Sequence, residues 1–138
     1  MKASRLIAYA VAASGLLIAL PACNTSTTDQ SYEMAERGHT RLEYSGFFIP
    51  DAKLRECVLA ALAERHWIVS EASGTIKARI ERGEQTAVAA IDVKDGVVSI
   101  ETKGSKISGT PYVPMRYIDF LMKSVRKNAA AAAKASGA

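Results

Sequence analysis

The chain has 138 residues, 49% of them hydrophobic and 23% charged, and a formal net charge of +4. This length and composition fit one globular domain and exclude a largely disordered chain. Two cysteines and two histidines are too few for a zinc site of the usual ligand spacing, and so small a charge does not favour nucleic-acid binding.

Residues 1–22 have the features of a secretory signal peptide. Lys2 and Arg5 form a positive start, and the run over residues 6–20 is uncharged and mostly apolar. Such a run is shorter than the about 20 residues that a membrane-spanning helix needs, and it matches the apolar core of a signal. We expect its removal on export, which lowers the charge from +4 to +2 because the segment holds two basic residues and no acidic one.

The residues around the cut indicate lipid attachment. Ordinary secretory cleavage after Ala22 requires a small residue at position 20, where the chain has Leu20. Leu20-Pro21-Ala22-Cys23 resembles the lipobox of bacterial lipoproteins, although Pro21 is uncommon in that motif. The resemblance implies cleavage before Cys23, a lipid on its thiol and an acyl chain, such as palmitate, on its new amino terminus.

The resemblance also implies a location. Asn24 follows the cysteine, and in the sorting rule of enteric bacteria a residue other than Asp there directs a lipoprotein to the outer membrane. We therefore expect a cell-envelope protein on the periplasmic face of the outer membrane, favoured over the inner membrane, with no nucleic acid as partner. With Cys23 lipidated, Cys57 lacks a partner for an internal disulfide, so the fold must rest on its core.

Two segments of simple composition flank the expected domain. Residues 23–38 are polar and lack clear periodicity, which predicts a lipid-anchored flexible tether, although Tyr32 and Met34 are suited to local packing. Residues 129–138 are nearly all alanine, which predicts a fraying helical tail or disorder. The domain is therefore placed at residues 39–128.

The domain begins with a strand or loop and then a helix. Residues 39–49 predict an entering strand with a bend at Gly46, or an ordered loop. Asp51 is predicted to cap the helix that follows. Apolar residues there recur at spacings of three and four, which predicts one buried helix face: Leu54, Cys57, Val58, Ala61 and Leu62. On this face Cys57 is expected to be a buried, inert thiol.

The periodicity then changes to two, which predicts an antiparallel meander of about four strands with one apolar face. The expected strands cover residues 67–69, 75–82, 86–93 and 97–103. Asp95-Gly96 predicts a two-residue hairpin turn because both residues tolerate a positive φ, and Trp67 is expected in the core.

A loop over residues 104–113 leads to a second amphipathic helix. Pro114 suits its first turn, and its apolar stripe contains Ile118, Leu121, Met122 and Val125. Two helices and a one-faced sheet predict an α+β fold, namely a two-layer sandwich with both helices on the apolar face of the sheet.

Residues suited to catalysis are scarce. His39 lies at the end of the expected tether and His66 at the helix-to-strand junction. The chain has no glycine-rich phosphate loop and no nucleophile elbow. Asp92 and Asp95 fit a strand and a turn better than a calcium site. We expect no enzymatic activity, no cofactor and no metal site.

Two surfaces are candidates for binding. The loop over residues 104–113 is longer than a simple connection, and Ser105, Lys106 and Tyr112 are its candidate contact residues, unless the loop only caps the core. The polar sheet face with Lys77 and Arg79 is the second candidate, unless it is plain solvent surface. Basic residues also gather between positions 103 and 134, which fits a solvated helix face or attraction to anionic lipid or glycan.

A loose pattern extends over residues 52–127. Its parts are ERHWIV at 64–69, Gly74-x-Ile76-x-Ala78, Ser99-Ile100 followed by Gly104-Ser105, and Tyr117 with Leu121. This pattern resembles a group of small proteobacterial lipoproteins, although Phe120 stands where members often have tryptophan after the tyrosine. The group has no assigned biochemical activity, so the resemblance implies an envelope location and an α+β fold and nothing about function.

These observations predict a membrane-tethered periplasmic lipoprotein that binds a protein or another envelope component. The lipid on Cys23 gives it a membrane, and an envelope protein is its expected partner. The alternative is a small-ligand or lipid-binding module, which a pocket lined by Tyr112, Tyr117 and Trp67 would favour.

Overall fold

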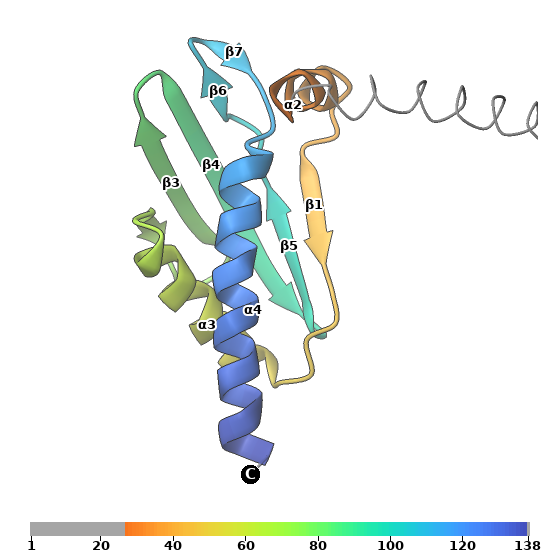
Figure 1. Ribbon diagram of the computed structural model, residues 1–138, viewed down its shortest axis with the longest axis vertical. Helices are drawn as coiled ribbons and strands as arrows, with labels where there is room; N and C mark the ends of the chain where they lie inside the picture. Colours follow the sequence, from red (N-terminus) through yellow and green to blue (C-terminus); the bar gives the residue numbers. More distant parts are fainter. Residues whose placement is uncertain (1–26, 138) are drawn as a thin grey trace, which may run out of the picture.

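An antiparallel sheet runs through the part of the chain that the computed structural model describes, residues 27–137 (Figure 1). The predicted meander forms four consecutive neighbours of this sheet, namely β2 (Ile68–Glu71), β3 (Ile76–Arg82), β4 (Gln85–Lys94) and β5 (Val97–Glu101). The α+β class and the antiparallel pairing are confirmed. The predicted signal at residues 1–22 and the lipid site at Cys23 lie outside the described residues.

The sheet has seven strands in the described part of the chain, so the prediction of about four was wrong. The additions are β1 (Arg41–Tyr44), β6 (Lys106–Ile107) and β7 (Thr110–Pro111). β1 pairs with β5 and completes the order β1-β5-β4-β3-β2, while β6 pairs with the start of β4 and β7 with β6. β4 has ten residues and β5 five, so the first residues of β4 extend past β5 and are covered by β6.

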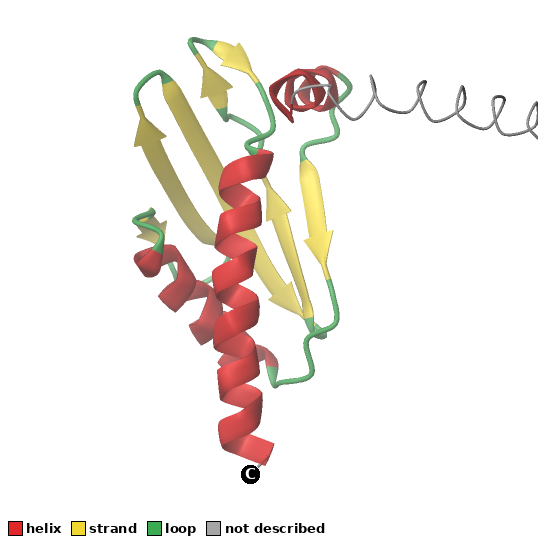
Figure 2. Cartoon of the chain, in the orientation of Figure 1, coloured by secondary structure: helices red, strands yellow, loops and turns green. Residues whose placement is uncertain are grey.

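Three helices accompany the sheet in the described residues (Figure 2). They are α2 (Thr27–Glu36), α3 (Asp51–Glu64) and α4 (Met115–Gly137). α4 runs through most of the alanine-rich tail and buries Ala129, so the helical alternative holds there.

Helix α2 lies where a flexible tether was expected, so that expectation was wrong for residues 27–36. Its Ser31 is 2% exposed, and the Ser31 carbonyl accepts a hydrogen bond from the Val113 N–H at 3.1 Å. The rings of Tyr32 and Tyr112 lie 6.5 Å apart. Contacts with a segment far along the chain therefore hold this helix, and a local pattern does not reveal them.

The core combines one face of the sheet with one face each of α3 and α4. The predicted apolar face of α3 is buried throughout. Ile118, Leu121, Met122 and Val125 of α4 join the same cluster as Ile76, Ile91 and Ile100 of the strands. Trp67 is 6% exposed, which confirms its place in the core.

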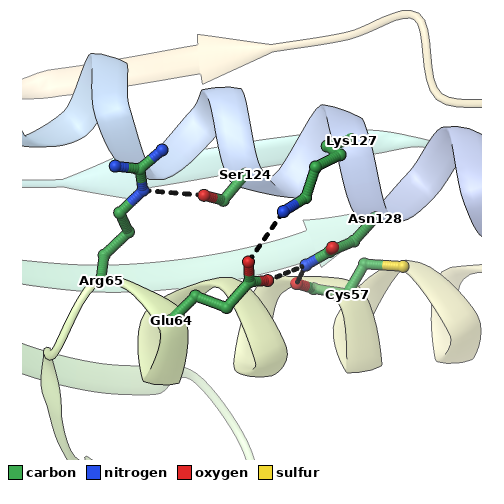
Figure 3. Close-up of polar contacts among 6 residues, drawn as sticks. All are labelled: Cys57, Glu64, Arg65, Ser124, Lys127 and Asn128. Atoms are coloured by element: carbon green, nitrogen blue, oxygen red, sulfur yellow. Dashed lines mark hydrogen bonds and ion pairs between the residues drawn. The ribbon is translucent and has the colours of Figure 1, made fainter.

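Polar contacts join α3 and α4 beside this core (Figure 3). The Glu64 carboxylate accepts hydrogen bonds from Lys127 at 3.0 Å and from Asn128 at 2.8 Å. Asn128 also donates to the Cys57 carbonyl at 3.3 Å, and Arg65 Nε donates to Ser124 Oγ at 2.8 Å. These contacts fix the register between the two helices. Burial raises the pKa of the Cys57 thiol, which keeps it protonated and unreactive.

Asp51 does not cap α3, and the prediction of an N-cap was wrong. Pro50 holds the cap position without a side-chain hydrogen bond. The Asp51 carboxylate instead accepts the N–H groups of Asp95 at 2.8 Å and Gly96 at 3.0 Å. Asp95 and Gly96 have φ values of 52° and 75°, which confirms the predicted hairpin turn.

Helix α3 ends in a Schellman arrangement. His66 has a φ of 65°, its N–H bonds to the Ala63 carbonyl at 3.1 Å, and the Trp67 N–H bonds to the Leu62 carbonyl at 2.9 Å. Glycine usually holds this left-handed position. His66 therefore has a structural place at the turn that sends Trp67 into the core.

Candidate functional site

A groove lies where the β6–β7 hairpin, α2 and the start of α4 meet. Its volume is about 640 Å³. The lining comes from four parts of the chain: Ser31, Gln85, Ile107, Tyr112, Pro114, Met115, Arg116, Tyr117, Asp119 and Phe120. The long loop predicted as a binding segment thus forms one wall, and the first turns of α4 form another.

Tyr112 is the central aromatic residue of the groove. It is 5% exposed, and its hydroxyl donates to Gln85 Oε1 at 3.5 Å. Burial, followed by the nearby Tyr117 and Tyr32, raises the pKa of Tyr112 to about 12. The phenol therefore stays protonated at physiological pH and acts as a neutral hydrogen-bonding group.

The outer rim of the groove combines charge with exposed apolar surface. Arg116 and Asp119 are exposed and have opposite charges. Phe120 is 42% exposed, which is unusual for a side chain of its size. Together with Ile107 and Tyr117, it gives the groove apolar walls beside a few polar groups, the usual composition of a binding site.

Ser105, a candidate contact residue, is structural. It is 1% exposed, and its hydroxyl donates to the Thr102 carbonyl at 2.8 Å and accepts the Val88 N–H at 2.8 Å. The side chain thus links β4 to the residues between β5 and β6, where the strand ladder is interrupted. The prediction that Ser105 contacts a ligand conflicts with this burial.

The other two loop candidates differ in position. Tyr112 lines the groove, as described above. Lys106 lies in β6, exposed, next to the groove residue Ile107 and paired with Thr86 of β4. The structure therefore brings Tyr112 into the groove and leaves Lys106 on the adjoining surface.

Lys77 and Arg79 lie on the polar face of the sheet and do not reach the groove. They alternate with the buried Ile76, Ala78 and Ile80, so they point away from the core. Lys77 pairs with Glu71 at 3.7 Å, and Arg79 pairs with Glu81. Exposed pairs of this kind contribute about 0–1 kcal/mol and are common on solvated strands.

Most of the groove residues were not predicted as contact residues, and Gln85, Ser31 and Phe120 illustrate why. Gln85 precedes Ala87 and Ala89 on the inward side of β4, so a polar residue in the apolar register was the available signal. Ser31 belongs to the unexpected α2. Phe120 is a large apolar residue outside the buried stripe of α4, which is the pattern of an exposed contact residue.

The chain matches no protein-family model and no curated protein sequence. Within residues 27–137 no helix combines the length and apolar character needed to cross a membrane. The same residues contain no group of three or more histidine, cysteine or acidic side chains placed to hold a metal ion.

Proposed function

We propose that this protein is a membrane-tethered lipoprotein of the cell envelope, without enzymatic activity, that binds a protein or another envelope component. The groove at the start of α4 is the observation that carries the proposal. Its Ile107, Tyr117 and Phe120 provide apolar contact area, and Gln85 and Tyr112 provide neutral hydrogen-bonding groups. Aromatic residues with a few polar groups are typical of protein contact sites.

The proposed anchor rests on the sequence of residues 1–24. The apolar run, the Leu20-Pro21-Ala22-Cys23 motif and Asn24 support lipidation of Cys23 and an outer-membrane location facing the periplasm. The resemblance to small proteobacterial lipoproteins supports the same location. Cys23→Ser should abolish processing and membrane retention, which fractionation of cells and metabolic labelling with a fatty acid would measure.

The chemistry of the groove supports binding rather than catalysis. Tyr112 remains a neutral phenol because its pKa is about 12. Neither histidine of the chain lines the groove. The lining residues include one carboxylate, Asp119, and no histidine, cysteine or lysine.

We infer that the domain is a two-layer sandwich. In this arrangement α3 and α4 cover the apolar face of the sheet, and the face with Lys77 and Arg79 stays open. The shared core of both helices and the strands supports it, as does the position of both helices in front of the sheet in Figure 2. The groove then lies at one end of the sandwich, clear of the open sheet face.

In-cell photo-crosslinking tests the binding proposal. A crosslinker replaces Lys106, beside the groove, and a second one replaces Lys77 on the sheet face. We expect one reproducible envelope component at Lys106 and none at Lys77. Capture at Lys77 alone would contradict the groove assignment and move the contact to the sheet face.

A matched pair of variants makes this test specific. Ile107→Asp places a charge in the groove at a half-buried side chain, and Val97→Asp makes the same change at a half-buried position of β5 that does not line the groove. Capture at Lys106 should be lost in Ile107→Asp and retained in Val97→Asp. Equal capture in both variants would contradict a role for the groove.

The size of the groove favours a small ligand or lipid as the second candidate occupant. About 640 Å³ lies within the usual range of roughly 300–1,000 Å³ for small-molecule sites. Two of the three aromatic residues expected to line such a pocket, Tyr112 and Tyr117, are present, whereas Trp67 is in the core. Native mass spectrometry of the purified protein would show a bound mass that Ile107→Asp removes.

A further inference from the structure

The outer face of α4 carries a row of basic residues. Arg116, Lys123, Lys127 and Lys134 follow one another at intervals of seven, four and seven residues. At 3.6 residues per turn, these intervals place the four side chains on one side of the helix. All four are exposed, and so is Phe120 on the same side. We call these five residues the basic stripe.

The basic stripe faces away from the protein core. Ile118, Leu121 and Val125 are fully buried on the opposite side of the same helix. Two acidic residues are adjacent: Asp119 flanks the stripe on α4, and Glu64 of α3 pairs with Lys127 at 3.0 Å. Four cations against two carboxylates leave the stripe with a net positive charge.

Exposed aromatic rings accompany these cations. The Phe120 ring lies 5.5 Å from the Arg65 guanidinium and 6.0 Å from the Lys123 ammonium group. Phe48 is 95% exposed, and it shares a shallow depression of about 220 Å³ with Arg126, Ala130 and Ala133 of α4. Two unburied phenylalanines beside basic side chains are costly in water, because their apolar surface stays hydrated.

Cations and the Phe120 ring on one exposed face, with the exposed Phe48 at its flank, fit the chemistry of an anionic bilayer surface. Each lysine or arginine near such a surface is attracted by the lipid headgroups, and apolar rings enter the boundary between headgroups and acyl chains. A solvated helix face explains the lysines alone; it gives Phe48 no role and leaves Phe120 only its place on the rim of the groove.

We propose that α4 lies on an anionic lipid surface through the basic stripe, with Phe120 and Phe48 entering the interface. The choice of a lipid surface rests on the proposed anchor at Cys23, which keeps the domain beside a bilayer. In this orientation Lys77 and Arg79 point away from the membrane, because they lie on the sheet face opposite the core. The lipid anchor then sets the location, and the stripe sets the orientation.

Tryptophan quenching by brominated acyl chains tests this orientation. The full-length chain, processed in cells, is reconstituted into vesicles of brominated phosphatidylcholine with or without phosphatidylglycerol. Phe120→Trp adds a reporter on the stripe, Lys77→Trp adds one on the sheet face, and Trp67 gives a constant buried background. We expect quenching of Phe120→Trp only with phosphatidylglycerol, no quenching of Lys77→Trp, and loss of the effect at high salt.

A charge-matched pair completes the design. The triple variant Arg116→Ser, Lys123→Ser, Lys134→Ser removes three charges from the stripe, and Arg82→Ser, Lys94→Ser, Lys103→Ser removes three exposed charges elsewhere. Both triple variants also carry Phe120→Trp, so quenching reports the ratio of protein with α4 on the bilayer to protein with α4 in water. The stripe variant should lower this ratio on the order of a hundredfold. The second variant should leave the ratio unchanged, and equal effects would overturn the proposal.

Flotation with the vesicles separates this proposal from the anchor. Protein that floats with both lipid mixtures and shows no quenching overturns the stripe and leaves the anchor intact. Protein that fails to float without phosphatidylglycerol, but is quenched when phosphatidylglycerol vesicles are added, overturns the anchor and supports the stripe. A photo-crosslinker at Lys123 that captures an acidic protein, without quenching, overturns the lipid assignment.

Discussion

The two ends of the sheet are completed in different ways. At the β4–β5 turn, the Asp51 carboxylate holds two backbone N–H groups, and a Cβ on Gly96 would lie 2.6 Å from the Phe47 carbonyl oxygen. At the other end, β4 begins at Gln85, and the β6–β7 hairpin and the start of α4 leave the groove between them. One end is closed by backbone contact, and the other presents side chains to solvent.

This difference separates stability from recognition along one strand. β4 contributes a turn that tolerates only glycine at its closed end and a groove residue at its open end. Substitutions at the closed end should lower the free energy of unfolding and leave binding intact. Substitutions of exposed groove residues should weaken binding and leave the free energy of unfolding unchanged, as is common where a rigid scaffold carries a binding site.

The largest effect is expected at the closed end. Gly96→Ala should lower the free energy of unfolding by about 2–4 kcal/mol, because it combines a left-handed φ of 75° with a clash against Phe47. Gly83→Ala is the matched control, since Gly83 has a φ of 58° and no neighbour within 4 Å of a Cβ. Its cost should be about 1–2 kcal/mol. Equal costs in urea denaturation would show that the closed end is not tightly packed.

The open end should also contain one residue that stability requires. Ser105→Ala removes the acceptor of the half-buried Val88 N–H and should cost about 1–3 kcal/mol. Ser108 is exposed in the same hairpin and bonds to Glu84 at 2.9 Å, so Ser108→Ala should change stability by less than about 0.5 kcal/mol. Thermal unfolding of both variants measures the difference. A similarly small effect in both variants would contradict the structural role of Ser105 and favour its earlier interpretation as a contact residue.

The end of α3 allows the cost of a left-handed backbone conformation to be measured without an added steric clash. His66→Gly should raise the free energy of unfolding by roughly 0.5–1 kcal/mol. Glycine adopts the φ of 65° without strain, and this gain outweighs the cost of a more flexible unfolded chain. His66→Ala keeps the strain and removes the imidazole, so it serves as the control. A gain in His66→Ala equal to that in His66→Gly would mean that the imidazole, and not the backbone, is responsible.

The smallest effect concerns acid stability of the contact between α3 and α4. The hydrogen bond from Asn128, followed by that from Lys127, lowers the pKa of Glu64 below its ordinary value of 4.5. A carboxyl group with a lowered folded-state pKa stabilises the fold above its unfolded pKa, and this contribution is lost as the pH falls through the folded pKa. Glu64→Gln should therefore flatten the loss of stability below about pH 4.5.

Denaturation at a series of pH values measures this effect. Glu56→Gln on the same helix is the control, because Glu56 pairs only with the exposed Lys53 at 3.7 Å among the contacts described. Two variants with the same pH dependence would contradict a specific role of Glu64 in joining the helices.

The elements that sequence periodicity predicted are those whose packing repeats locally. The alternation from Ile76 to Ile80 and the three-and-four spacing from Leu54 to Leu62 each depend on one buried face, which neighbouring residues encode. Asp95-Gly96 was predictable because the turn depends on the φ preferences of two residues.

The remainder depends on contacts between distant residues. The Asp51 carboxylate bonds to a turn more than forty positions later, so its sequence context indicated a cap instead. The strands β6 and β7 have two residues each, too few to show a period. The groove combines α2, β4, β6 and α4, and Tyr112 is the one candidate loop or sheet-face residue that lines it.

Helix α2 has a mechanical consequence for the proposed anchor. A flexible leash over residues 23–38 would allow a reach of about 55 Å, at roughly 3.5 Å per residue. Because the chain is helical from Thr27 and docked at Ser31, residues 23–26 separate the proposed anchor from this helix, and four residues at full extension cover at most about 14 Å. If Cys23 carries the proposed anchor, the domain stays close to the bilayer surface, and a binding partner has to be at that same membrane.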